Sequence, residues 1–575
     1  MNTDKANARL CGVLAVALTA LAGIILRDIY LLQYEQHAAY LYPYVLDSAY
    51  YDAWAQRVAD GGGYGPKPFY MAPLYPYALA SVYKVMGHKP AVVYALQAIL
   101  GMYSVLLVYL LGRRLFGHIS GLAAMGLIVL YAPLMYLESK ILTETLAVAL
   151  NLTSFLLLIR AVERPTASRY LLAGIALGLS AVCRPVALIT IAMVVPWLVF
   201  GSLRRWSGFR SRSLAPLILG VALAVLPVTA RNYFVGKDFA FISTNGGIVF
   251  AQGNHQSSQG LFVALPGFSG TVMTQQEEEM AIAAKALGHP VKPSESSSYW
   301  FGQGLRFIHE HPGDYLQLLG RKAIWSLHNR EAPCNYNVYL ERTIIPILRY
   351  LPLPFSLLAG LALFGFIRGR REEVKLKCDL LALFILSTFL SLIIFVVSSR
   401  FRVPAAPLLA VFAGFGLVQA VDAVRTRSSR TAALMGACLI LALLPSLVPY
   451  PTPPITVEAL GNLGATYLTI GEADKAMAMA EKALDVDPDS AQAHNVLGGA
   501  LQTKGKLDQA IQEYQEAIRI KPDFVDAHAN LALIFYLKRE YAEAWNEVHL
   551  SLRYGAEAHP GFLKALSQKM PDPGE

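Results

Sequence analysis

The chain has 575 residues, of which 55% are hydrophobic and only 15% are charged. A soluble protein carries about 25% charged residues, so this composition excludes an ordinary soluble enzyme and predicts that lipid surrounds most of the chain. The net charge of +9 does not indicate nucleic-acid binding, because the basic residues gather in short connections between apolar runs.

Apolar runs dominate the first 450 residues. A run of about 20 residues is long enough to cross a membrane as a helix, and we count about eleven such runs. They are centred near residues 20, 102, 127, 150, 175, 193, 222, 357, 387, 413 and 440. The first run has no small-residue cleavage site after it, so we expect it to remain as the first span. Residues 1–450 are therefore predicted to form a polytopic bundle of membrane helices.

The basic connections predict the side of the membrane on which each loop lies. If all spans are real, the basic clusters fall on the side of the N-terminus; they lie around Arg113, Arg164, Arg204, Arg368 and Arg427. The positive-inside rule then places the N-terminus in the cytoplasm of a bacterium and the protein in its inner membrane. Two long loops, about residues 33–90 and 233–344, are expected on the periplasmic side, together with the chain after residue 450.

The first outer loop carries two aspartates in a segment with helical spacing. Asp47, Tyr51 and Ala55 are four residues apart and would share one face of a helix. Asp47 would lie at the start of that helix, where aspartate is also a good N-cap. The spacing alone leaves both interpretations open, a cap or a functional acid, and it leaves Asp52 as a second candidate.

Some basic residues lie on the outer side, against the topological trend. They are Lys67, Lys140, Arg184, Arg400 and Arg402. Arginine suits bidentate contacts with phosphate and lysine serves as a point charge. The alternative for each is a side chain that reaches lipid headgroups from the end of a span.

A repeat follows a proline-rich break at Pro449, Pro451, Pro453 and Pro454. At a period of 34 residues, Leu463, Gly464, Tyr467, Ala476, Ala483 and Pro488 recur as Leu497, Gly498, Leu501, Ala510, Ala517 and Pro522. A third copy keeps Leu531, Ala532, Phe535 and Ala544. This pattern is typical of tetratricopeptide repeats, and we predict an α-solenoid of three units over residues 455–560, with a tail at 561–575. The fold class is all-α throughout.

Several segments of the membrane part together resemble the GT-C membrane glycosyltransferases. They are Asp47 with Tyr51, Pro73-Leu74-Tyr75-Pro76, Arg113-Arg114-Leu115-Phe116-Gly117, Glu138-Ser139-Lys140 with Thr143-Glu144, Cys183-Arg184-Pro185, and Ser399 to Pro404. Their order is similar to that in dolichyl-phosphate-mannose-protein mannosyltransferases and lipid A aminoarabinose transferases, over about residues 10–425. These enzymes often have Glu where this chain has Ser48, which leaves open whether Asp47 or Asp52 is the functional acid.

The resemblance implies that the protein moves a sugar from a polyprenyl-phosphate donor to an acceptor hydroxyl on the periplasmic side, with inversion. It implies a carboxylate base in the first outer loop, Asp47 or Asp52. Cationic groups should stabilise the leaving phosphate; the candidates are Lys67, Arg184, Arg400 and Arg402. Sugar or acceptor is expected to contact Tyr51, Glu138, Lys140, Glu144, Asn245 and Asn254.

The sequence contains no P-loop, dinucleotide-binding or zinc-binding motif, and therefore no recognisable cofactor-binding pattern. We expect no cofactor and no dedicated metal site, with a divalent metal at Glu138 or Glu144 as the alternative. The expected partners are the lipid-linked donor, membrane lipid, an unidentified glycan, lipid or protein acceptor, and a protein bound to the repeats. Nucleic acid is not expected.

Two other functions fit the same sequence. An O-antigen ligase or polymerase would depend on Arg or His of a late periplasmic loop and would not need the aspartates of the first loop. A non-enzymatic scaffold would act through the repeats alone. The repeats could also pack against their own membrane domain instead of binding a partner.

Overall fold

The computed structural model describes residues 2–36, 47–203, 214–262, 265, 268, 272–332, 337–351, 353–370, 374–451, 456–554 and 560–574. Within these ranges every regular element is a helix, and the extended backbone is limited to an isolated bridge between Leu261 and Val397. The prediction of an all-α protein is confirmed. The basic cluster expected around Arg204 and the prolines Pro453 and Pro454 lie outside the described residues.

Seven segments of the described chain are helical, long and apolar enough to cross a membrane. They are Leu10–Gln36 of α1 (Asn2–Gln36), α5 (Pro90–Phe116), α8 (Glu144–Glu163), α11 (Leu214–Phe234), α18 (Lys375–Ile394), Ser399–Arg425 and Ser429–Leu447. The last two consist of α19 (Ser399–Arg402), η3 (Val403–Ala405), α20 (Ala406–Arg425), α21 (Ser429–Leu443) and η4 (Leu444–Leu447). The chain is a multi-pass membrane protein.

Four further apolar helices are shorter than a full span: α6 (His118–Val129), α9 (Ala167–Cys183), α10 (Ala187–Leu203) and α17 (Phe355–Gly369). The predicted apolar runs all lie in helices, but the count of about eleven spans is not confirmed. Prolines account for part of the shortening. Pro185 separates α9 from α10, and Pro133 lies in the first turn of α7 (Ala132–Glu138), which follows α6. A proline lacks the N–H that would continue a helix through it.

Glycines allow two pairs of membrane helices to pack closely. A Cβ atom on Gly174 of α9 would overlap the carbonyl oxygen of Leu217 in α11, and one on Gly220 would overlap that of Leu171. A Cβ atom on Gly365 of α17 would likewise overlap the carbonyl oxygen of Phe412 in α20. In a membrane, where lipid is as apolar as the side chains, close backbone approach through small residues is a main source of helix association.

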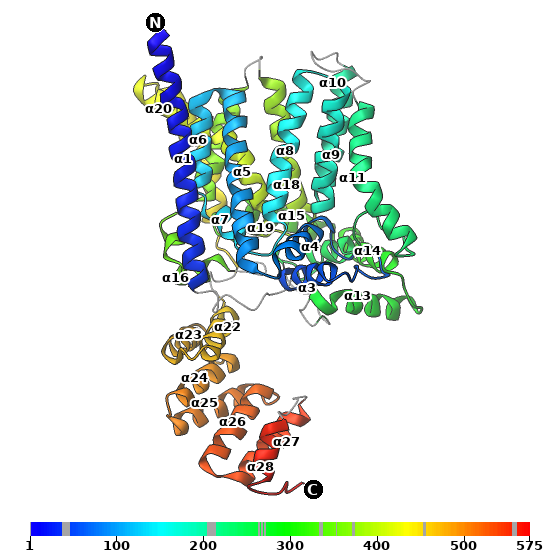
Figure 1. Cartoon of the computed structure of the whole chain (residues 1–575), viewed down its shortest axis with the longest axis vertical. Helices are drawn as coiled ribbons and strands as arrows, with labels where there is room; N and C mark the ends of the chain where they lie inside the picture. Colours follow the sequence, from blue (N-terminus) through cyan, green and yellow to red (C-terminus); the bar gives the residue numbers. More distant parts are fainter. Residues whose placement is uncertain are drawn as a thin grey trace. The chain divides into compact units, whose positions relative to one another are not determined.

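The helices of the two long loops gather at the end of the bundle opposite to the N-terminus (Figure 1). The first loop forms α3 (Asp47–Ala59) and α4 (Leu74–Met86). The second forms α12 (Gly246–Gly253), α13 (Val272–Leu287), α14 (Pro293–Glu310) and α15 (Pro312–Leu327) there. The next helix, α16 (Val338–Ile344), belongs mostly to the second compact unit described below, and η2 (Pro346–Arg349) follows the loop. Both loops therefore lie at the same end of the membrane domain.

The chain divides into two compact units, and the second consists mainly of Tyr450–Glu575. It contains the helices α22 (Val457–Thr469), α23 (Ala473–Val486), α24 (Ala491–Thr503), α25 (Leu507–Ile520), α26 (Val525–Lys538), α27 (Tyr541–Arg553) and α28 (Pro560–Ser567). The small residues of the repeat are fully buried between the helices of each pair; they are Ala476, Ala483, Ala510, Ala517 and Ala544. The tetratricopeptide fold of this region is confirmed.

Two segments outside the predicted repeats complete the core of this unit. Leu340 and Ile344 of α16 pack against the core of the first helix pair. At the other end, Leu566 of α28 is buried against Trp545 of α27. Terminal repeats need such covers because one of their faces has no neighbouring repeat.

Candidate active site

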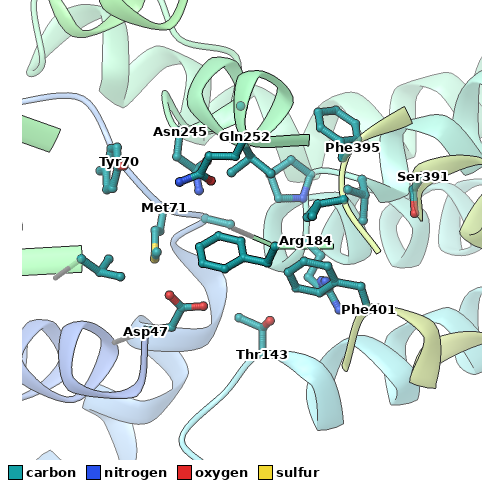
Figure 2. A pocket seen from close by; sticks show the side chains of 18 of the residues that line it. Asp47, Tyr70, Met71, Thr143, Arg184, Asn245, Gln252, Ser391, Phe395 and Phe401 are labelled. Carbon is teal, nitrogen blue, oxygen red and sulfur yellow. The ribbon is translucent and has the colours of Figure 1, made fainter. Parts of the chain in front are cut away.

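A pocket of about 440 Å³ lies where the two long loops meet the membrane helices. Asp47 and Thr143 lie on one side of it, with Asn245, Gln252 and Phe395 on the other (Figure 2). Arg184 and Arg400 add positive charge to the polar part of the wall. The apolar part is formed by Leu188 and Ile189 of α10 and by Leu392, Phe395 and Val396 at the end of α18.

Four charged side chains from distant parts of the sequence form one network at this pocket. Arg400 Nη2 lies 2.6 Å from Asp47 Oδ2, and Arg400 Nε donates to Glu144 Oε1 at 2.8 Å. The same Glu144 oxygen lies 3.4 Å from Arg184 Nη1. Both guanidinium groups also lie over the ring of Phe401, at 4.8 Å for Arg184 and 4.9 Å for Arg400. Glu144 therefore links the two arginines to each other and, through Arg400, to Asp47.

The ends of helices position these groups. Asp47 and Glu144 are in the first turns of α3 and α8, and Arg184 is the C-cap residue of α9. Carboxylates at helix N-termini and cations at C-termini are each favoured by the helix dipole. Arg400 belongs to the single turn of α19, which begins the span Ser399–Arg425 and directly follows α18 and a short connection. The breaks between helices therefore bring the charges together at one level of the membrane domain.

Two predicted sugar-binding residues also line the pocket. Tyr51 lies one turn after Asp47 on α3, and its ring packs edge-on against Tyr75 at 5.5 Å. Burial, together with the charge of Asp47, raises the pKa of the Tyr51 phenol well above its ordinary value, so it remains a neutral hydrogen-bonding group. Asn245 is the N-cap residue of α12, and its Oδ1 accepts a hydrogen bond from Ser243 Oγ at 3.1 Å.

Asp52 does not line this pocket. Its carboxylate lies between α3 and α4, where it accepts hydrogen bonds from Tyr83 Oη at 2.5 Å and Gln56 Nε2 at 2.6 Å. His88 Nε2 lies 3.0 Å from the same group. These contacts attach α3 to the end of α4. Of the two aspartates that the sequence left open, the structure brings only Asp47 to the arginines.

Glu138 and Lys140 face the interior of the bundle instead of the pocket. Arg27 of α1 donates to both carboxylate oxygens of Glu138, at 2.7 and 2.8 Å. Lys140 Nζ lies over the ring of Tyr34, 4.3 Å from its centroid. Gln97 of α5 donates to the carbonyl oxygens of both residues. This segment fastens α7 to α1 and α5.

Three further candidates have protein partners away from the pocket. Lys67 lies on the surface, 3.6 Å from Glu277. Arg402 is buried against the ring of Phe355 at 4.0 Å and lies 3.0 Å from Glu331. Asn254 donates to the carbonyl oxygens of Phe250 and Ile394 at 2.8 and 2.9 Å. These contacts hold loops to helices, and none of the three residues is among those that line the pocket.

Sequence reasoning overlooked α13. Val272, Gln275 and Glu278 of this helix line the pocket, although none of them was among the candidates taken from the sequence. The only signal in the sequence was the amphipathic pattern of a short helix, and such a pattern is common on protein surfaces. Within the described residues, no group of three or more His, Cys, Asp or Glu side chains could hold a metal ion.

Comparison with known proteins adds two family matches. Residues 67–230 match the profile of the family described as dolichyl-phosphate-mannose-protein mannosyltransferase. Residues 457–490 and 501–538 match tetratricopeptide repeat profiles. Among curated proteins, none matches the chain.

Among solved structures, the chain is similar to an oligosaccharyltransferase from Archaeoglobus fulgidus, with 13% identity over 80% of this chain and 58% of that one, and a TM-score of 0.44. It is also similar to ArnT from Cupriavidus metallidurans bound to undecaprenyl phosphate, with 13% identity over 91% of this chain and 80% of that one, and a TM-score of 0.41. The match over residues 67–230 confirms the resemblance expected from the sequence motifs for that part of the chain, and the repeat profiles confirm the tetratricopeptide pattern. Residues 67–230 of the membrane domain are therefore similar to the family described as dolichyl-phosphate-mannose-protein mannosyltransferase, and the C-terminal unit carries tetratricopeptide repeats.

Proposed function

We propose that this protein is a membrane glycosyltransferase that moves a sugar from a polyprenyl-phosphate donor to an acceptor hydroxyl, with Asp47 as the general base. The observation that carries the proposal is the pocket in which Asp47, Arg184 and Arg400 meet beside an apolar wall. The family match over residues 67–230 supports the same reaction class. In a lipid-linked sugar, the charged phosphate lies between the polar sugar and the apolar polyprenyl chain. The pocket likewise combines polar residues, the two arginines and an apolar wall.

The two arginines are the proposed donor phosphate site. A guanidinium group offers paired N–H donors that suit a phosphate, and its charge persists at all physiological pH values. Glu144 holds both guanidinium groups from the side, at 2.8 Å from Arg400 Nε and 3.4 Å from Arg184 Nη1. The polyprenyl chain would lie against Leu188, Leu392 and Phe395, at the level where α10 and α18 meet the membrane surface.

The proposed step couples proton transfer to the departure of the phosphate. The acceptor oxygen attacks the anomeric carbon with its lone pair while its proton passes to the Asp47 carboxylate. The bond between that carbon and the phosphate oxygen breaks, and its electron pair leaves with the phosphate, which gains one negative charge. Attack from the face opposite to the phosphate inverts the configuration.

The charges of the network favour this order of events. With Asp47 and Glu144 ionised, the two carboxylates balance Arg184 and Arg400. Protonation of Asp47 leaves the network with a net positive charge at the moment when the phosphate becomes more negative. Charge that develops in the transition state next to fixed cations in a water-poor site is strongly stabilised.

The same proposal covers the setting of the reaction. The protein would lie in a bacterial inner membrane with its pocket on the periplasmic side, where the acceptor is a glycan, lipid or protein hydroxyl. The tetratricopeptide repeats would bind a protein partner on that side. Neither a cofactor nor a nucleic acid enters the reaction.

The change Asp47→Asn tests the base. Asparagine keeps the shape of the side chain but cannot accept the proton, and loss of a general base costs about 10²–10⁴ in rate. Release of polyprenyl phosphate from a polyprenyl-phosphate sugar, measured in membranes that contain the cell's own acceptors, should fall by that factor. Binding of the donor should persist because Arg184 and Arg400 remain.

Asp52→Asn is the matched control on the same helix. It weakens the contacts of α3 with Tyr83 and His88, so it should reduce thermal stability while turnover per folded molecule stays near that of the wild type. Normal turnover by Asp47→Asn, or inactivity confined to Asp52→Asn, would remove Asp47 as the base. Full activity of both variants would refute the proposed reaction.

A further inference from the structure

A second, open pocket adjoins the candidate active site. It has a volume of about 370 Å³ and is lined by Gly246, Gly247, Ser297, Ser298, Phe301 and Phe395. Gly246 and Phe395 line the first pocket as well, so a ligand can extend from one pocket into the other. In Figure 2, Phe395 lies across the first pocket from Asp47. The volume of the second pocket is within the range of sites that bind small ligands.

Close packing between α12 and α14 gives this pocket a fixed shape. A Cβ atom on Gly247 would overlap the carbonyl oxygen of Ser297, and one on Gly304 would lie 2.6 Å from the ring of Phe250. The N–H group of Gly247 also donates to Ser297 Oγ at 3.1 Å. A pocket whose walls are already in contact requires little further ordering when a ligand binds.

The two serines offer complementary polar groups. Ser297 Oγ accepts the hydrogen bond from Gly247, which leaves its own hydroxyl hydrogen able to donate to a ligand. Ser298 Oγ donates to the carbonyl oxygen of Ser294 at 2.9 Å, which leaves its lone pairs able to accept. A sugar hydroxyl both donates and accepts, so it matches this pair of serines.

The remaining walls are aromatic and uncharged. Phe301 is 42% exposed, stacks one face of its ring on Phe250 at 4.3 Å, and lines the pocket. The face of an aromatic ring is partially negative and suits the slightly positive C–H groups of a sugar ring. The described residues that line this pocket include no ionisable side chain, so a phosphate or carboxylate bound here would lack a counter-charge.

We propose that the second pocket is a subsite for a neutral sugar unit of the acceptor. The inference rests on the proposed function, because it assigns the first pocket to the donor. The donor phosphate has its partners at Arg184 and Arg400, and the polyprenyl chain has the apolar wall. The uncharged pocket is then available to the acceptor, which should carry a sugar next to the hydroxyl that reacts.

Protection of an introduced cysteine tests this subsite. With the exposed Cys11 and also Cys334 replaced by serine, Ser298→Cys should react with a maleimide, and n-hexyl glycosides of glucose, galactose or mannose should slow that reaction. n-Hexanol and n-hexyl phosphate, which probe for an apolar and an anionic site, should not slow it. Gly302→Cys is the control, because residue 302 lies on the same helix outside the pocket lining, and none of the probes should affect its labelling.

Two substitutions of Phe301 make the test more specific. Phe301→Ala should weaken protection by a glycoside about three- to tenfold, the loss expected for one aromatic contact. Phe301→Tyr keeps the ring and should retain protection. Equal protection by n-hexanol would assign the pocket to lipid chains and overturn the proposal. Protection by n-hexyl phosphate, or no protection by any of the three glycosides, would overturn it as well.

Asp47→Asn in the same background separates the subsite from the proposed reaction. It should abolish transfer and leave protection by the glycoside unchanged, since residue 47 does not line the second pocket. Active transfer without protection would remove the subsite alone. A different result is that the glycoside protects the cysteine while the wild-type protein transfers no sugar. That result would refute the proposed function and keep the second pocket as a sugar site.

Discussion

At the scale of single residues, Asp47 and Asp52 show how position separates two identical side chains. Both belong to α3, but the carboxylate of Asp52 is held between two helices by Tyr83 and Gln56. Asp47 instead contacts Arg400 and lines the pocket. A general base must lie within hydrogen-bonding reach of the proton that it removes, so the proposal of Asp47 as the base rests on the direction of its side chain.

Glu144 is expected to act as a positioning residue. Glu144→Gln keeps the size of the side chain but removes the negative charge that accepts the hydrogen bond from Arg400, and it weakens the hold on Arg184. The loss should raise the KM for the donor about tenfold. Because Asp47 remains, kcat should change less than KM in a steady-state assay with polyprenyl-phosphate sugar.

Glu163 at the opposite end of α8 provides the control. Its carboxylate pairs with Lys377 at 2.7 Å and with Arg114. None of these three residues lines the pocket. Glu163→Gln should leave the KM for the donor unchanged. An unchanged KM in Glu144→Gln as well would show that the arginines do not depend on this carboxylate.

At the scale of elements, α13 is a wall of the pocket that is fastened by a buried acid. Tyr70 Oη donates to Glu279 Oε2 at 3.3 Å, and Trp300 Nε1 donates to the carbonyl oxygen of Glu279 at 3.1 Å. The Glu279 side chain is buried, and this burial raises its pKa from 4.5 to about 8. The helix is therefore attached most firmly when this carboxyl group is neutral.

The attachment of α13 should depend on pH. Because the pKa of Glu279 is higher in the folded state, its stabilising effect is complete below about pH 4.5 and is lost as the pH rises to about 8. Hydrogen exchange of residues 272–287, corrected for the intrinsic rate, should therefore increase as the pH rises through that window. Glu279→Gln cannot ionise and should show no such increase.

Glu277→Gln tests whether the effect belongs to the buried carboxyl. Glu277 lies on the same helix, but its side chain is exposed and pairs only at the surface with Lys67. This variant should keep the pH dependence of the wild type. The same pH dependence in Glu279→Gln would assign the effect to another group.

At the scale of the whole molecule, the membrane unit ends beside the second outer loop. Asn329 N–H donates to Ser446 Oγ at 2.9 Å, and His328 Nε2 lies 3.3 Å from the carbonyl oxygen of Val448. The first unit extends to Pro449. The first unit therefore ends at the same end of the bundle that carries the pocket.

This connection and the distribution of arginines predict one topology. A reporter that is active only after export should be active when it is fused after residue 575 and silent when it is fused within residues 204–212. The physical reason is that short loops rich in arginine remain in the cytoplasm. Silence of the C-terminal fusion would mean that an odd number of the helices expected to span the membrane does not cross it.

The sequence by itself determined the class of protein and its two parts. Low charge and long apolar runs require a lipid environment, and the 34-residue period of small residues requires stacked helix pairs. Both signals are local, because they depend on neighbours along one helix. The motif Ser399-Arg400-Phe401-Arg402 likewise predicted the end of a span, and it begins the apolar segment Ser399–Arg425.

Only the tertiary structure decided which candidates meet. Asp47, Glu144, Arg184 and Arg400 come from four separate helices or helix ends, and their convergence depends on how those helices pack. Arg402 lies two residues from Arg400, yet it faces Phe355 and Glu331. The direction of a side chain and the number of full spans both depend on contacts between distant helices, which no periodicity in the sequence records.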